Sequence, residues 1–370
     1  MTRIAIVGCG VVGAAIAYEL SRIDCLSLIV FDQQSPAQAS TGAALGILVG
    51  IISQKTKGRA WELRQRSIRR YHTLIPELES ILGQSIPGNR HGLLDLQFAG
   101  ANLQVWQNLI EIRREQGWCL ELLDPEQVQA RYPKINCEGV TGAVYSPQDQ
   151  QIEPIALTLA LVEAARKNGV NFQFGTTVQP IASKDHWQSP HVLKGLQTSR
   201  GNWPVDAVIL ASGLGTSAVS HTAPRMQPVL GQAMRLRLNT TLDPNLPVVS
   251  GEDVHIVPLN SHECWIGATV EFSTGEDLEE VTADPERMTT VQEQAIQMYP
   301  DLAHAEMVDY WSGLRPRPVG QSAPVIEPLP GFSNILLATG HYRNGVLLAP
   351  ATAEIVRDRL GEILEHRKRQ

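Results

Sequence analysis

Short runs of apolar residues near both ends and in the middle of the chain predict buried strands. Residues 3–8 (RIAIVG) and 26–31 (LSLIVF) are two such runs, and the segment 13–22 between them has the pattern of a helix. Comparable apolar runs lie at 206–212 (DAVILAS) and 334–340 (NILLATG). Buried strands that alternate with helices are typical of a parallel sheet covered by helices. The chain therefore opens with a strand–helix–strand unit.

Helices are predicted where apolar residues recur at helical spacing or where helix-end residues bracket a run. The segment 153–169 ends in Lys, Asn and Gly, and 124–131 begins with Asp-Pro, both typical of helix ends. The predicted helices are 13–22, 60–82, 101–117, 124–131, 153–169, 284–299 and 345–360. The alternating run 232–238 and the apolar runs 254–259 and 264–270 predict successive antiparallel strands.

Basic residues gather at the start of the predicted helix 60–82, at Arg59, Arg64, Arg66, Arg69 and Arg70. Because the apolar residues of this helix keep a helical spacing of their own, we interpret the arginines as a solvated face. The whole chain has 31 Lys+Arg against 38 Asp+Glu, a net charge of −7. This balance gives no reason to expect nucleic acid as a partner.

The five cysteines stand at positions 9, 25, 119, 137 and 264, without a CxxC pair. Their odd number and spacing argue against a disulfide framework and a zinc site, and they fit a reducing cytosol. No apolar run reaches the ~20 residues that span a bilayer. The first strand leaves no room for a signal peptide, so we expect a cytoplasmic protein. Its oligomeric state is open, with a homo-oligomer as one alternative.

The first predicted strand runs into the pattern Gly8-x-Gly10-x-x-Gly13, directly before the predicted helix. In a dinucleotide-binding unit the first glycine permits a tight turn, the second lets a pyrophosphate approach, and the third lets helix and strand pack closely. The helix N-terminus then faces the phosphates. Asp32 follows Gly8 by 24 residues, where an acidic residue can bond a ribose hydroxyl. A purely structural turn is the alternative, and the strand–helix–strand context favours dinucleotide binding.

Two further junctions between a strand and glycines occur, at 208–215 (VILASGLG) and 336–345 (LLATGHYRNG). Each could present backbone N–H groups to another part of a long cofactor, or each could be an ordinary turn at a strand end. A nicotinamide cofactor needs little beyond the first unit. The additional junctions therefore favour FAD.

Four segments carry a family signature: 4–20 (IAIVGCGVVGAAIAYEL), 39–46 (ASTGAALG), 312–316 (SGLRP) and 340–350 (GHYRNGVLLAP). Together they resemble the D-amino-acid-oxidase superfamily, and within it the glycine oxidases, an enzyme type that also serves thiamine biosynthesis. The resemblance covers nearly the entire chain. The last two segments, with Arg315 and Arg343 separated by 28 residues, are its most specific part.

The expected fold class is α/β (α+β overall), with a Rossmann-like FAD-binding domain interleaved with a smaller domain on a mostly antiparallel sheet. The FAD-binding domain is predicted to consist of 1–82, 151–222 and 311–370. The substrate-binding domain is predicted to consist of 83–150 and 223–310.

The resemblance implies non-covalent FAD and a small amino acid as substrate, which is oxidised to its imine while O2 takes the electrons. Expected cofactor-binding residues lie at the three junctions and in the loops between them. They are Gly8, Gly10, Val11, Val12, Gly13, Asp32, Gln33, Ser40, Thr41, Ala43, Ala44, Gly46, Leu48, Val178, Ala211, Ser212, Gly213, His341, Arg343, Asn344, Gly345, Val346 and Leu347. No acid or base is assigned, because hydride transfer from a neutral amine requires mainly orientation and desolvation.

On the substrate side, the resemblance assigns Arg315, His255, Arg343 and Val270. Arg315 matches the position that holds the substrate carboxylate, although from the residues alone a structural ion pair is as good an interpretation. Arg343 lies in the segment that closes the site beside the flavin, and Val270 ends the segment GATV that lines the substrate side. His255 stands where glycine oxidases usually carry a tyrosine, which is a second carboxylate ligand.

The other polar residues are interpreted as structural, and no metal site is expected. Asp149 and Glu153 are read as loop and helix cap. Five histidines do not have the spacing of metal ligands. They are His91, His186, His221, His262 and His304.

Other functions stay open. A D-amino-acid dehydrogenase would pass electrons to a quinone or another carrier instead of O2. A sarcosine oxidase is disfavoured because related enzymes tether their flavin through a cysteine, and no cysteine follows Cys264. A non-catalytic flavin-binding protein or an RNA-modification partner is a remote alternative, which the acidic charge balance and the two arginines disfavour.

Overall fold

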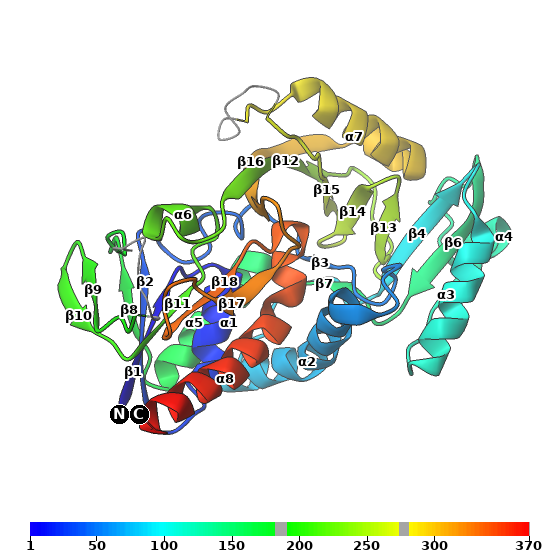
Figure 1. The fold of residues 1–370 in the computed structure, drawn as a ribbon. Helices are drawn as coiled ribbons and strands as arrows, with labels where there is room; N and C mark the ends of the chain where they lie inside the picture. The colour runs from blue at the N-terminus through cyan, green and yellow to red at the C-terminus, as the bar shows by residue number, and fades with distance from the viewer. Residues whose placement is uncertain (182–190, 274–280, 370) are drawn as a thin grey trace.

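The computed structural model describes residues 1–181, 191–273 and 281–369, and it contains two large sheets that lie side by side (Figure 1). The first sheet has six strands, and all neighbours are parallel except β17 and β18. In spatial order the strands are β17 (Val325–Pro328), β18 (Ile335–Thr339), β11 (Ala207–Leu210), β1 (Thr2–Val7), β2 (Leu26–Asp32) and β8 (Asn171–Phe174). The predicted parallel sheet is confirmed.

Helices cover one face of the first sheet (Figure 1). The central helix α1 (Val11–Leu20) packs against α5 (Pro154–Lys167) and α8 (Gly345–Arg369), and α2 (Gly58–Leu82) packs against α8. Nine of the ten residues of α1 are buried, because other helices surround it on the sides that do not face the sheet. A helix that is apolar on all sides is typical of the interior of a domain.

The second sheet has eight strands and is antiparallel except where β13 pairs with β4. Its order is β16 (Glu306–Pro318), β12 (Met226–Arg237), β15 (Glu263–Gly267), β14 (Val254–Pro258), β13 (Val248–Gly251), β4 (Leu93–Phe98), β6 (Val140–Ser146) and β5 (Glu121–Leu123). The predicted antiparallel strands in the region 232–267 are confirmed. Strands β4, β5 and β6 were not predicted within the mixed region 90–150.

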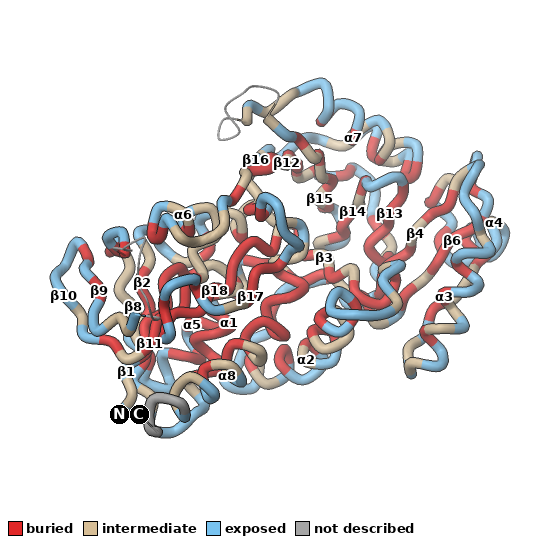
Figure 2. Tube along the Cα trace, in the orientation of Figure 1, coloured by how far each residue is buried: buried red, intermediate tan, exposed pale blue. Residues whose placement is uncertain are grey.

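The two faces of the second sheet differ, as expected when side chains alternate along each strand. One face packs against α7 (Pro285–Met298) and α4 (Pro125–Arg131) through residues such as Leu94, Ile256 and Ile266. Figure 2 shows this buried layer between the sheet and α7. The other face carries Ser250 and His255. There β16 approaches the first part of the chain so closely that a Cβ on Gly313 would lie 2.2 Å from the Cβ of Ala43.

Shorter elements connect the sheets. The two-residue strand β3 (Ile47–Leu48) pairs with β7 (Gln150–Gln151), and α3 (Leu103–Glu115) precedes β5. A hairpin of β9 (Gly195–Thr198) and β10 (Gly201–Pro204) and the short helix α6 (Thr216–Val219) complete the elements that position the site. The division into two domains stays a proposal. Strand β16 runs through residue 311, where that division begins a new segment.

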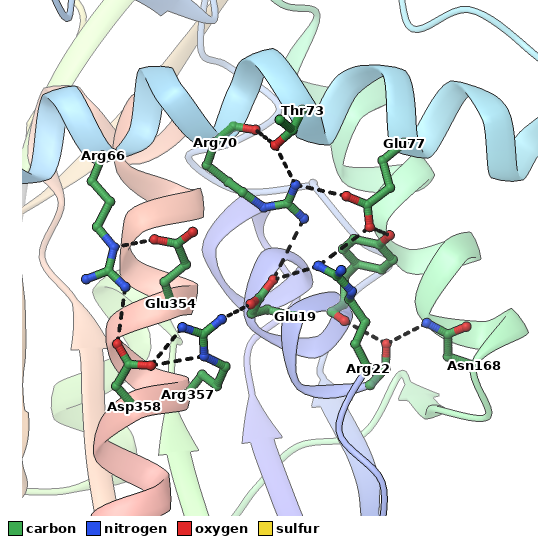
Figure 3. A network of polar contacts seen from close by, with 12 residues as sticks. Glu19, Arg22, Arg66, Arg70, Thr73, Glu77, Asn168, Glu354, Arg357 and Asp358 are labelled. Atoms are coloured by element: carbon green, nitrogen blue, oxygen red, sulfur yellow. Dashed lines mark hydrogen bonds and ion pairs between the residues drawn. The ribbon is translucent and has the colours of Figure 1, made fainter.

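The arginines of α2 do not all form a solvated face, which corrects that prediction. Arg59 and Arg69 are exposed, but Arg66 forms ion pairs with Glu354 and Asp358 of α8. Arg70 contacts acidic residues of α1 and of its own helix. Figure 3 shows that these contacts form one network between α1, α2 and α8, centred on Glu19, Arg70, Arg357 and their neighbours. The helix spacing predicted which side is apolar but not that a second helix lies beside the basic side.

Candidate cofactor and substrate site

The three glycines at the start of α1 have different surroundings. Gly8 has φ +101°, and a Cβ on it would lie 2.6 Å from the carbonyl oxygen of Ala211. A Cβ on Gly13 would lie 2.0 Å from the carbonyl oxygen of Gly8. A Cβ on Gly10 would have only Thr41 Oγ1 nearby, at 3.0 Å. Gly8 and Gly13 are therefore required by backbone packing, whereas a Cβ on Gly10 would meet one side-chain atom and no backbone atom, which suits the approach of a pyrophosphate.

Polar groups around this turn orient its backbone. The Cys9 N–H donates to Asp32 Oδ2 at 2.6 Å, and the Val11 N–H donates to Thr41 Oγ1 at 3.0 Å. Asp32 Oδ1 also accepts the Gln34 N–H at 2.9 Å. A carboxylate can accept about four hydrogen bonds, so Asp32 keeps capacity for a ribose hydroxyl. Asp32 thus ends β2 beside the glycine turn, in a position that fits the ribose contact proposed for it from the sequence.

The other two glycine junctions lie beside the first, because β11 and β18 follow β1 in the sheet. At the end of β11, Ser212 Oγ lies 3.3 Å from Thr216 Oγ1. Thr216 Oγ1 in turn lies 2.9 Å from Thr339 Oγ1 at the end of β18. Ala211 and Gly213, with φ +56° at Gly213, therefore stand between the two outer turns. Ligands of open parallel sheets bind outside these carboxyl ends.

The predicted loop 39–46 contacts both the N-terminal end of α1 and the second sheet. Ser40 Oγ donates to the carbonyl oxygen of Leu314, and Trp311 Nε1 donates to that of Ala43 at 3.1 Å. Both partners belong to β16. The loop then passes Ala44 and Gly46 into β3, which contains Leu48. It therefore lies between the two sheets, beside the glycine turn.

Some predicted cofactor residues lie at the periphery of this arrangement. Gln33 directly follows β2, and Val12 is the second residue of α1. Val178 forms an isolated bridge with Thr198 beyond the end of β8. Together with the residues at the three junctions, they remain proposed cofactor contacts.

Arg315 extends from β16 across Gly231 of β12. A Cβ on Gly231 would lie 2.2 Å from the guanidinium, so only glycine leaves room for it. Arg315 Nη1 donates to the carbonyl oxygens of Leu230 at 3.1 Å and Thr269 at 3.0 Å. Burial, followed by the nearby cation of Arg343, lowers the pKa of Arg315. Among the described residues, no carboxylate forms an ion pair with Arg315.

His255 lies on the same face of the second sheet, in a register row with Ser250, Gly267 and Ala233. Its Nδ1 lies 2.7 Å from Ser250 Oγ. Burial and then the positive charge of Arg343 lower the pKa of His255 to about 4, so the imidazole is neutral at pH 7. Arg343 forms an exposed ion pair with Asp253, with Nη2 and Oδ1 3.1 Å apart. Arg315, Arg343 and His255 therefore lie near one another, although they come from separate parts of the chain.

The side chains of the turn from His341 to Gly345 have different partners. His341 Nε2 lies 2.9 Å from Thr352 Oγ1, and burial lowers its pKa to about 3. This side chain is a neutral packing group turned toward α8. Asn344 Oδ1 accepts from Arg64 Nη2 at 3.4 Å. Helix α8 begins at Gly345 with Val346 and Leu347, so its positive dipole end lies at this turn.

Val270 does not belong to a strand, which corrects the predicted strand 264–270. Strand β15 ends at Gly267, and the Val270 carbonyl oxygen accepts from Arg287 Nη1 at 3.1 Å. The chain leaves the sheet here, while Thr269 turns its carbonyl oxygen toward Arg315. Val270 stays a proposed substrate contact.

Three buried charged groups near the site were not assigned to it from the sequence. Glu271, 3% exposed, accepts from Gln232 Nε2 at 2.6 Å, from the Asp284 N–H at 2.8 Å and from the Thr269 hydroxyl. Its negative charge acts against the lowering of the Arg315 pKa. Asp149 and Arg113 are fully buried. An acidic residue within an apolar alternation, as in Val270-Glu271-Phe272, is the one sequence signal for Glu271.

The remaining polar predictions have structural explanations. Glu153 caps α5 by accepting the N–H groups of Ile155 and Ala156, as predicted. No group of three or more potential metal ligands occurs among the described residues. His186 lies outside the described residues. Within the described residues, no helix is both long and apolar enough to cross a membrane.

The loop 39–46 connects the glycine turn at the carboxyl edge of the parallel sheet with β16 of the second sheet, which carries Arg315. An open parallel sheet with glycine turns at this edge is typical of a dinucleotide-binding protein. The chain belongs to the FAD dependent oxidoreductase family, which matches residues 3–359. The family resemblance drawn from the sequence is confirmed, and FAD is the cofactor.

Relatives of known type cover most of the chain. It is 31% identical to the bifunctional protein ThiO/ThiG of Synechocystis sp. over 95% of this chain and 50% of that protein. It is 28% identical to the glycine oxidase of Geobacillus kaustophilus over 96% of this chain and 92% of that protein. The chain thus spans about half the length of the ThiO/ThiG relatives that it matches.

Solved structures have the same fold. The crystal structure of glycine oxidase from Geobacillus kaustophilus aligns with a TM-score of 0.83 at 28% identity, and the alignment covers 98% of this chain and 95% of that one. The glycine oxidase structure from Bacillus cereus aligns with the same TM-score at 24% identity, with the same coverage of both chains. The predicted combination of a Rossmann-like part and an antiparallel sheet is thereby confirmed.

Proposed function

We propose that the protein is an amino-acid oxidase, which converts glycine or another small amino acid, such as a D-amino acid or sarcosine, to the imine. The imine would hydrolyse to the 2-oxo acid, and O2 would be reduced to H2O2. The glycine oxidase and ThiO/ThiG relatives support this proposal, and a role in thiamine biosynthesis is part of it. Non-covalent FAD is included because Cys264, the last cysteine, is buried within the second sheet.

The observation that carries the proposal is the guanidinium of Arg315. It is held by two backbone carbonyl oxygens, and within the described part of the chain it lacks an acidic ion-pair partner. Arg315 is partly buried, and a cation that loses part of its hydration is costly unless a negative group compensates it. A carboxylate on the substrate supplies that charge, and the planar donors of arginine bind it bidentately.

The chain's own residues bind and orient the substrate in this proposal. Arg315 fixes the carboxylate, and neutral His255, held by Ser250, adds a hydrogen-bonding group without adding a charge. Arg343 makes the potential near His255 more positive. FAD, when bound, supplies the two-electron acceptor. Binding beside two cations also favours loss of a proton from the substrate ammonium group.

Purified protein supplied with FAD should release H2O2 with at least one substrate among glycine, sarcosine and small D-amino acids. The measurement is a coupled peroxidase assay over this panel, with the corresponding L-amino acids as controls. If the flavin is reduced anaerobically by an amino acid but air produces no H2O2, the protein is a dehydrogenase that uses another carrier. If no amino acid reduces the flavin, the proposal fails.

His255→Tyr should change substrate preference more than it changes stability. Tyrosine would place a phenol where the shorter imidazole now stands beside Ser250, on the face shared with Arg315. We expect the ratio of kcat/KM values for glycine and a larger D-amino acid to change at least about tenfold, or about 1.4 kcal/mol. His262→Tyr is the matched control, because His262 is exposed. Unchanged ratios in His255→Tyr would remove His255 from the site.

A further inference from the structure

The backbone segment 50–55, between β3 and α2, is held by a buried acid. Asp149 is fully buried, and its carboxylate accepts three successive N–H groups. The distances are 2.8 Å from Gly50, 2.8 Å from Ile51 and 2.7 Å from Ile52. The prediction that Asp149 is a simple loop residue therefore misses its main contacts.

A buried base holds the carbonyl oxygens of the same segment. Arg113 of α3 is also fully buried and donates to Ile51 at 2.7 Å, Ser53 at 2.6 Å and Lys55 at 2.8 Å. Its guanidinium lies 3.6 Å from the ring centroid of Trp61, close enough for a cation–π interaction. Burial lowers the pKa of Arg113 to about 10, so it remains charged at pH 7.

The segment is therefore fixed from two sides by groups of opposite charge. Asp149 accepts hydrogen bonds from its N–H groups, and Arg113 donates hydrogen bonds to its carbonyl oxygens. The charges of Asp149 and Arg113 also attract each other. Removing one partner of such an arrangement leaves an uncompensated buried charge, which is strongly unfavourable. Both Asp149 and Arg113 come from the region between α2 and α5, far along the sequence from the segment 50–55 that they contact.

The held segment continues directly into the cofactor site. Strand β3 precedes it and contains Leu48, and β3 pairs with β7, which begins one residue after Asp149. Strand β3 also packs against α8, whose first turn follows Asn344. Arg64 connects Asp149 with the turn before α8, because it donates a hydrogen bond to Asn344 and is attracted by the charge of Asp149.

We propose that Asp149 and Arg113 are positioning residues for FAD. They fix the segment 50–55, which follows β3, and β3 packs against α8, so that the parts of the chain around the flavin site keep one spacing before the cofactor binds. A preformed site loses less free energy to ordering when its ligand binds. Asp149 and Arg64 carry opposite charges that attract each other, so removing one of them should change the relative affinities for oxidised and reduced flavin. This proposal rests on FAD binding and is independent of the amino-acid substrate.

The test is Asp149→Asn, which keeps the shape and removes the negative charge. We expect the Kd of FAD to rise by about 10- to 100-fold, in analogy with the loss of affinity when groups that orient metal ligands are removed. The reduction potential of the bound flavin should also shift, by about 30 mV for each tenfold change in the ratio of oxidised and reduced affinities. Arg113→Lys should act in the same direction, because an ammonium cannot reach three carbonyl oxygens.

Glu19→Gln is the matched control. Glu19 is a buried acid with ion pairs to Arg22, Arg70 and Arg357, but it lies at the far end of α1 from the glycine turn. This variant should lower Tm without changing the Kd of FAD or the flavin potential. The proposal is overturned if either folded variant, Asp149→Asn or Arg113→Lys, binds FAD as wild type does with an unchanged potential. Neither readout involves an amino acid, so such a result would leave the proposed oxidase activity unaffected.

Discussion

Arg315→Ala should leave a folded, yellow protein that has lost most of its activity toward substrates with a carboxylate. The guanidinium is held by backbone carbonyl oxygens, so its removal breaks no ion pair within the described residues. A desolvated carboxylate without its charged partner costs roughly 2–5 kcal/mol. At about 1.4 kcal/mol per factor of ten, kcat/KM should fall about 30- to several-thousand-fold. The measurement is steady-state kinetics alongside the flavin absorbance spectrum.

Two comparisons separate carboxylate binding from a general loss of structure. Arg315→Lys should recover only part of the activity, because a point charge does not reproduce the planar donors. Arg237→Ala is the matched control, since Arg237 forms a half-exposed ion pair with Glu263 at the other end of β12. If Arg315→Ala keeps near wild-type kcat/KM, the carboxylate ligand lies elsewhere, and Arg343 is the next candidate.

Gly10→Val should yield a protein that folds but does not retain FAD. A Cβ on Gly10 meets only Thr41 Oγ1 at 3.0 Å, so a small shift of one side chain accommodates it without moving backbone. The same side chain would occupy the space through which the pyrophosphate approaches the helix N-terminus. We expect the Kd of FAD to increase by more than about 100-fold, or about 2.7 kcal/mol. The measurement is titration of the apo-protein with FAD, together with far-UV circular dichroism.

The neighbouring glycines provide the contrast for this result. Gly13→Val should disturb folding itself, because a Cβ there would overlap the carbonyl oxygen of Gly8. Gly361→Val, in an exposed part of α8 with open space around it, should change neither folding nor FAD binding. Normal flavin content in Gly10→Val would show that the glycine pattern serves only as a turn.

The parallel half of the fold could be predicted because its signals are local. The apolar run of β1, the glycine spacing and the helix α1 lie within the first twenty residues, and each restricts the others. Strands β4 and β6 could not be predicted in the same way. The sequence Leu93–Phe98 has an incomplete alternation, and β4 is placed by its pairing with β13, whose residues lie about 150 positions later. Such pairing depends on contacts that no local pattern contains.

For the site, the sequence indicated which segments meet but not how each side chain is used. His341 stands in the predicted turn, yet its imidazole packs against Thr352. Asp149 has the local pattern of a loop residue, and only burial beneath the 50–52 backbone reveals its three N–H donors. The role of a buried charge depends on its surroundings in three dimensions, and residue type or spacing does not encode these directly.

The position of α1 has a consequence for the order in which the protein is made. Helix α1 is apolar on nearly all sides and is covered by α8, which the ribosome synthesises more than 300 residues later. At about 5–20 residues per second, α1 and the glycine turn wait roughly 15–70 s for this partner. During that time the apolar side of α1 lacks the cover that α8 provides in the folded protein. Cofactor capture at the complete site therefore requires that α8 has already been synthesised.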